Sequence, residues 1–169
     1  MQLYYNRITE FTTVAGNFAG GHSRGLEMGL AQERFVEDFC DAWGDGTSER
    51  KPDVEKILSM MSEDAEWQLW VPGGPTIRGR DALRQEIHRQ MRFATNNKCN
   101  IVNVVSSDRM VMQERSDSAI IRGRPCPHQM VAIYELDDAG LIKRWREYLD
   151  MADLMRKQGT DEAFAAHGG

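Results

Sequence analysis

The order of hydrophobic patterns along the chain is the feature that most constrains its fold. Apolar residues recur at helical spacing in three early segments, 30–43, 52–61 and 80–93. Four β-rich runs follow, each separated from the next by turn-forming residues, at 100–106, 110–121, 129–136 and 142–150. Helices followed by consecutive strands predict an α+β fold, in which helices cover one face of a curved, largely antiparallel sheet that encloses an interior.

Two more elements complete the predicted domain. A strand over 65–71 is ended by a turn at Pro72–Pro75, and a closing helix spans 151–157. We expect 62–64, a polar Ser-Glu-Asp stretch, to break the second helix. The expected division is an irregular arm rich in Gly, Thr and Asn (1–29), one domain with three to four helices (30–157) and a tail (158–169).

Composition excludes several classes of partner. The net charge is -5 and the charges are interspersed, so the chain lacks the basic stripe that holds nucleic acid. No apolar run reaches the ~20 residues that span a membrane, and no secretory signal is visible, so we expect a cytoplasmic protein. The cysteines Cys40, Cys99 and Cys126 lie far apart, which predicts reduced, structural thiols and neither disulfides nor a metal site.

Strand alternation places two carboxylates on the predicted interior. Arg115 and Asp117 are two residues apart and share a strand face with apolar Ile121. By the same rule Glu147 shares a face with Trp145 on the last strand. An Arg between two carboxylates could hold both in a fixed geometry and separate their pKa values into an acid and a base. The alternative is a solvated strand face, on which charges at this spacing are common.

Four motifs extend this reading to a family: Ser-Glu-Asp-Ala at 62–65, Arg-Gly-Arg-Asp-Ala-Leu at 78–83, Glu-Arg-Ser-Asp at 114–117 and Trp-Arg-Glu-Tyr-Leu-Asp at 145–150. With them, residues 30–157 resemble the limonene epoxide hydrolase group of the SnoaL-like, nuclear transport factor 2-like (NTF2-like) superfamily. The resemblance implies a cone-shaped domain that needs no cofactor. It also implies that Asp117 protonates the leaving oxygen, Arg115 bridges the carboxylates and Glu147 is the base.

The chain departs from that group at the positions that hold the attacking water. Where the hydrolases have Tyr and Asn, Trp67 and Leu69 stand here. Leu cannot form a hydrogen bond and the Trp indole can only donate one. The group's base is an Asp, whereas Glu147 is one methylene longer. The carboxylates are therefore retained while the means of holding water is lost.

This combination predicts a lyase rather than a hydrolase. In a 1,3-diol the O–H that loses its proton belongs to the substrate, so no held water is needed. Some proteins resembling this superfamily release formaldehyde from lignin-derived diarylpropane diols, and an interior with Trp67, Leu69 and Trp145 suits such a bulky aromatic substrate. Two alternatives stay open, namely an epoxide hydrolase and a non-catalytic ligand-binding module of the same fold.

Two residues of the third β-rich run are further candidates for substrate binding. His128 and Tyr134 share its predicted inner face. His128 could instead be a rim or core histidine bound to a backbone carbonyl. Of the two tryptophans in 65–71, parity assigns Trp67 and not Trp70 to the interior. Since relatives commonly pair through the outer face of the sheet, we also expect a homodimer.

Overall fold

The strands form one curled, mixed sheet in the computed structural model, which describes residues 22–159, with side chains from residue 29. The predicted arm as far as residue 21 and the tail from residue 160 lie outside the described residues. The strands are β1 (Met61–Val71), β2 (Thr76–Arg78), β3 (Ala94–Lys98), β4 (Ile101–Ser106), β5 (Met110–Ile121), β6 (Arg124–Pro125), β7 (His128–Leu136) and β8 (Ile142–Leu149). Their order is β2-β1-β8-β7-β5-β3, and β4 and β6 also pair with β5.

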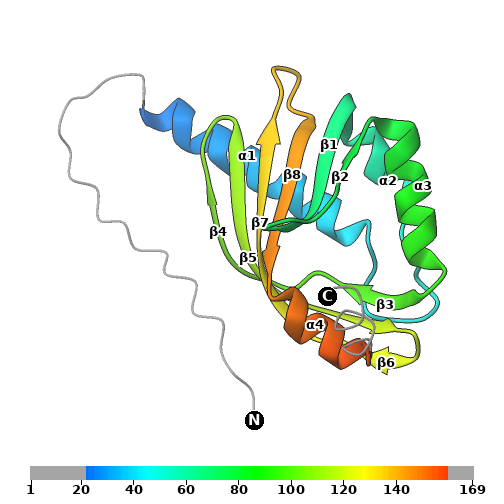
Figure 1. Ribbon diagram of the computed structural model, residues 1–169. Coiled ribbons are helices and arrows are strands. Elements are labelled where there is room, and N and C mark those ends of the chain that lie inside the picture. Colours follow the sequence, from blue (N-terminus) through cyan, green and yellow to red (C-terminus); the bar gives the residue numbers. More distant parts are fainter. Residues whose placement is uncertain (1–21, 160–169) are drawn as a thin grey trace, which may run out of the picture.

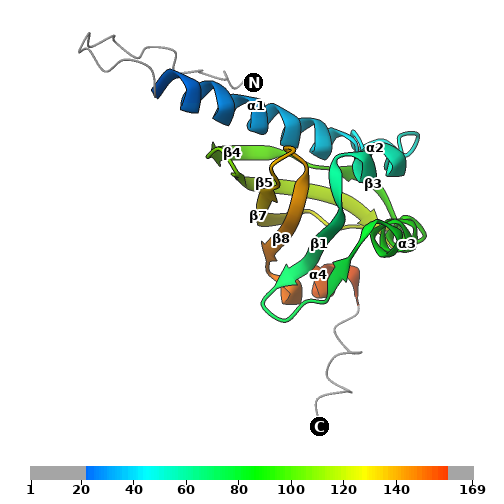
Figure 2. The same cartoon turned by 90° about the horizontal axis from the view of Figure 1, so that it is seen from above.

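Four described helices surround this sheet: α1 (His22–Asp41), α2 (Val54–Ser59), α3 (Arg80–Met91) and α4 (Met151–Gln158). The long α1 runs behind the strands, α3 stands beside β1 and β2, and α4 lies at the lower end of the sheet (Figures 1 and 2). β1 pairs with β8 in parallel, whereas the other neighbours are antiparallel. The predicted α+β cone with a curved mixed sheet is therefore confirmed. No helix within residues 22–159 has the length and apolar character needed to cross a membrane.

The first helix begins earlier than the sequence pattern predicts. It starts at His22, so the predicted irregular arm is wrong for its last residues. Contact with β4 explains the difference. Gly29 is buried so closely against this strand that a Cβ atom there would lie 2.9 Å from Ser106 Oγ, and the Ser106 hydroxyl donates to Glu33 at 2.6 Å. Tertiary contact thus outweighs the low helix propensity of a glycine-containing segment.

The second helix ends earlier than predicted. Asp53 caps its start by accepting a hydrogen bond from the backbone N–H of Lys56 at 3.0 Å. Met61, predicted to lie on the apolar stripe of this helix, instead opens β1 opposite Ile142 of β8. Residues 62–64, expected to break this helix, also belong to β1, so the strand begins at Met61 and not at residue 65 as predicted. The short strands β2, β3 and β6 were not predicted, because their pairing with longer strands, rather than any local pattern, makes them strands.

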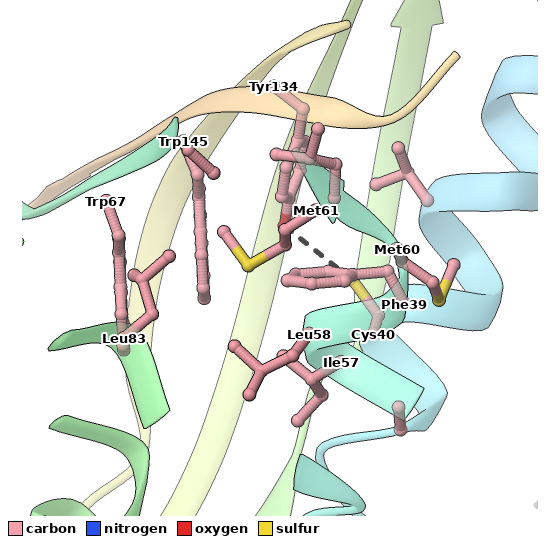
Figure 3. Close-up of a cluster of buried hydrophobic side chains, with 14 of the residues drawn as sticks. Phe39, Cys40, Ile57, Leu58, Met60, Met61, Trp67, Leu83, Tyr134 and Trp145 are labelled. Atoms are coloured by element: carbon pink, nitrogen blue, oxygen red, sulfur yellow. Dashed lines mark hydrogen bonds between the residues drawn. The ribbon is translucent and has the colours of Figure 1, made fainter. Parts of the chain in front are cut away.

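An aromatic cluster fills the space between α1 and the sheet. Phe39 of α1 packs edge-on against Tyr134 and Trp145, with ring centroids 5.8 and 5.2 Å away. Trp67 and Trp145 stack with parallel planes at 4.3 Å, because they are register partners on the parallel strands β1 and β8. Figure 3 shows these rings side by side. Such aromatic pairs each add about 0.5–1.5 kcal/mol beyond their buried area, so the cluster anchors α1 and the strands to one another.

Candidate active site

Sheet register brings three chemically active side chains together although they come from two strands, β5 and β8, that are separated by β7. Residues in register form rows across the inner face. One row joins Gln113, Ala132 and Glu147, and the adjacent row begins with Arg115 on β5. Because Ala132 has only a methyl group, long side chains from β5 and β8 can meet above β7. Arg115 reaches across this gap toward Glu147.

The resulting triad is buried and directly bonded. Arg115, Asp117 and Glu147 have 3%, 6% and 9% of their surface exposed. The Arg115 guanidinium donates to Asp117 Oδ2 from Nε at 3.1 Å and from Nη2 at 2.6 Å, and Nη2 also donates to Glu147 Oε1 at 3.4 Å. The predicted contact of Arg115 with both carboxylates is therefore confirmed. Two acid groups therefore meet a single nitrogen atom at a buried position.

The two carboxyl groups have unequal surroundings. Asp117 accepts both Arg115 bonds and a third, on Oδ1, from the backbone N–H of Asn100 at 3.2 Å. Three N–H groups thus donate to this carboxyl group. Glu147 has only the longer Arg115 contact, and burial raises its pKa to about 8, against an opposing effect of Arg115 and a smaller one of Trp67. The Trp67 indole N–H lies close enough to Glu147 to lower its pKa slightly. It forms no hydrogen bond of ordinary geometry with the carboxyl group. Glu147 therefore carries a proton at neutral pH.

Tyr134, predicted to bind substrate, lies behind the triad and does not line the cavity described below. It is fully buried, and its hydroxyl accepts a hydrogen bond from Arg115 Nη1. On the same side, the Cys40 thiol donates to Gln113 Oε1 at 3.3 Å and lies 3.7 Å from Arg115 Nη1. The strand face was assigned correctly, but α1 covers this part of it. These groups hold Arg115 from behind and leave its other edge for the carboxylates.

A cavity of about 370 Å³ opens in front of the triad. All three triad residues line it, as do four of the predicted substrate-binding residues, Trp67, Leu69, His128 and Trp145. His128 Nδ1 bonds the Cys126 carbonyl at 2.9 Å, as the structural alternative predicts, and His128 also lines the cavity. The walls are largely apolar and aromatic, which suits a bulky hydrophobic molecule.

Other cavity residues were not found from the sequence. Trp70 lines the cavity together with Trp67, although alternation assigns them to opposite faces. The register of β1 against β8 shifts between Gln68 and Val71, and this irregularity breaks the alternation. Phe93 and Arg122 also line the cavity, and their only sequence signal is their position at the ends of predicted elements. Within the described residues, no three His, Cys, Asp or Glu side chains cluster in a way that could hold a metal ion.

Comparisons with known proteins place this site in context. The family described as SnoaL-like domain matches residues 36–145, and no curated protein sequence matches significantly. Among solved structures, an LEH-like epoxide hydrolase of M. tuberculosis has 21% identity and a TM-score of 0.64, covering 83% of this chain and 98% of that one. A phenazine biosynthesis-related protein of Pseudomonas aeruginosa has 19% identity and a TM-score of 0.67, covering 82% and 92%. The epoxide hydrolase/cyclase-like enzyme SalBIII, from salinomycin pyran ring formation, has 17% identity and a TM-score of 0.62, covering 73% and 94%. At these sequence identities, the similarities show a shared fold.

Proposed function

The chain belongs to the SnoaL-like family, and from this premise we propose that it is a cofactor-independent lyase that releases formaldehyde from a bulky aromatic 1,3-diol, such as a lignin-derived diarylpropane. The observation that carries the proposal is a buried acid–base pair that faces a largely apolar cavity, beside two wall residues, Trp67 and Leu69, that offer a water molecule no acceptor. Asp117 and Glu147 converge on Arg115, while Trp67 and Leu69 occupy the neighbouring wall. A binding module gains little from burying two carboxylates beside a cavity.

Each carboxyl group performs one proton transfer in this reaction. Asp117 accepts the proton of the terminal CH2–OH group, since its Oδ1 accepts only one hydrogen bond and retains a free lone pair. The bond between that carbon and its neighbour breaks, and formaldehyde leaves. The electron pair of this bond forms a C=C bond to the carbinol carbon, whose hydroxyl takes the Glu147 proton and departs as water. The products are formaldehyde, water and a stilbene.

These roles reverse those implied by the family resemblance, which makes Asp117 the acid and Glu147 the base. The reversal is supported by the unequal surroundings of the two groups. Burial raises the pKa of Glu147 to about 8, whereas Asp117 accepts three N–H hydrogen bonds. An acid with a pKa near the working pH is also an efficient proton donor.

The pH dependence distinguishes the two role assignments. If Glu147 is the acid, kcat/KM should fall above pH 8, by about tenfold per pH unit, as this group loses its proton in the free enzyme. If Glu147 were the base, kcat/KM would instead rise through pH 8. Initial rates of formaldehyde release between pH 6 and 10 measure this. A rising profile would restore the assignment implied by the resemblance.

Epoxide hydrolysis remains the second candidate, because one structural relative is an epoxide hydrolase. A hydrolase must position water against carbon, and positioning is a large part of its rate advantage. Trp67 and Leu69 supply no acceptor for that water. We therefore expect slow diol formation from epoxides.

A direct comparison of substrates tests the lyase proposal. The purified enzyme, without added metal or cofactor, is offered 1,2-bis(4-methoxyphenyl)propane-1,3-diol and, separately, limonene epoxide in ¹⁸O-labelled water. We expect formaldehyde and a stilbene in equal amounts from the diol, and little ¹⁸O in any vicinal diol from the epoxide. Rapid ¹⁸O incorporation without aldehyde release from the diol would show that the protein is a hydrolase.

A further inference from the structure

The charge on the cavity wall differs in sign from that of the chain as a whole. The net charge is -5, yet outside the buried triad the fully charged residues that line the cavity are all basic, namely Arg89, Lys98 and Arg122. Among the residues that the structure describes, the acidic ones that line the cavity are Asp117 and Glu147, which belong to the triad. The outer part of the cavity therefore has a positive character that neither the reaction nor the apolar walls require.

Arg122 and Lys98 are the members of this basic set that form no salt bridge among the described residues, and Arg122 is the one that follows β5, the strand that carries Asp117. The Arg122 guanidinium carbon is 6.0 Å from the ring centroid of Phe93. Arg89 lies near the same ring, at 5.3 Å, but forms a salt bridge with Glu86 at 2.6 Å. Within residues 29–159, Arg122 takes part in no ion pair. Among the described residues, its charge at the cavity therefore has no counter-ion.

The backbone at Arg122 is unusual for an arginine. Its φ angle of 51° lies in the left-handed region, and its N–H donates to the Phe93 carbonyl at 2.7 Å. Gly123 follows with a φ angle of 79°. Turns with two positive φ angles favour Asn or Gly at the first position, where a longer side chain adds strain. The turn alone therefore does not account for an arginine here, whereas a ligand contact at the cavity would.

The distance between Arg122 and Asp117 indicates the length of the ligand. Arg122 follows Asp117 by five residues, which is about 16 Å along an extended strand. That length matches two aromatic rings joined by a short linker. We propose that the substrate carries a carboxylate on the ring remote from the diol, and that Arg122, with Arg89 beside it, binds this carboxylate at the outer end of the cavity. The substrate class named here rests on the proposed lyase function.

Equilibrium binding tests this subsite without any need for turnover. The probes are trans-stilbene-4-carboxylate and neutral 4-methoxy-trans-stilbene, followed by quenching of tryptophan fluorescence at low ionic strength. We expect the wild-type protein to bind the carboxylate about tenfold more tightly than the neutral probe. Arg122→Gln should abolish this preference while leaving neutral binding unchanged, and Arg122→Lys should keep most of it.

Arg124→Gln is the matched control. Arg124 is an exposed arginine two residues away that does not line the cavity, so its replacement should change neither affinity. The absence of a carboxylate preference in the wild type would overturn the proposal. An equal loss for both probes in Arg122→Gln, or equal effects of Arg122→Gln and Arg124→Gln, would overturn it as well.

Turnover separates this subsite from the lyase proposal itself. If a preference that depends on Arg122 is present but no diol releases formaldehyde, the anion subsite stands and the lyase function fails. If diols are cleaved and neither kcat/KM nor binding favours the carboxylated form, the lyase function stands and the subsite fails.

Discussion

Replacing Glu147 with Gln, or Asp117 with Asn, is expected to lower kcat/KM for formaldehyde release from the diol by about a hundredfold or more at pH 7. Each change removes one proton transfer from the transition state, and lost acid–base catalysis has this scale. The side chains keep nearly the same shape, so the cavity is preserved. Glu114→Gln is the matched control, because Glu114 lies on the same strand as Asp117 but is exposed on the other face. Near-normal rates in either triad variant would remove that residue from the mechanism.

The stability of Glu147→Gln provides an independent check of the buried acid. The folded protein raises the pKa of Glu147 from the ordinary 4.5 to about 8. The folded state therefore binds the proton more tightly than the unfolded chain does. The stability linked to this proton is fully present below pH 4.5 and is lost as the pH rises through 8. Relative to the wild type, the Gln variant should gain stability between pH 5 and 9, on the order of a few kcal/mol, which urea unfolding at the two pH values can measure.

Replacing Arg115 with Met should destabilise the fold by about 3–5 kcal/mol at pH 8, because it leaves buried carboxylates without their counter-charge. Arg115 is 3% exposed and bonds Asp117, Glu147 and Tyr134. Denaturant unfolding measures the loss. It should be smaller at pH 5, where Glu147 is protonated, and adding Asp117→Asn to the variant should recover part of it.

The matched control for this variant is Arg78→Met. Arg78 also bonds a carboxylate, Glu66 at 2.8 Å, but its side chain is 66% exposed. Exposed pairs of this kind contribute about 0–1 kcal/mol, so the control should be nearly as stable as the wild type. A loss below 1 kcal/mol in Arg115→Met would mean that the triad is far better solvated than its burial indicates.

Strand alternation alone predicted which charged residues face the interior. The run 110–121 was predicted with the bounds that β5 has, and within it Arg115 and Asp117 are buried while Ser116 and Ser118 are exposed. This prediction succeeds because side-chain direction in a strand has a period of two, whatever the rest of the fold does. Where a strand bulges, as β1 does before Val71, the same rule fails, and Trp70 reaches the cavity.

What the sequence by itself determined is therefore the α+β class, most of the elements and the face on which Arg115, Asp117 and Glu147 lie, since these follow from local periodicity. Only the tertiary structure decided that Ala132 lets Arg115 meet Glu147 across β7, that Tyr134 lies behind Arg115, and that Arg122 lines the cavity. It also decided the protonation of Glu147. The physical reason is that contacts between strands, covering by a helix and removal from water depend on how distant segments pack, and no local pattern records them.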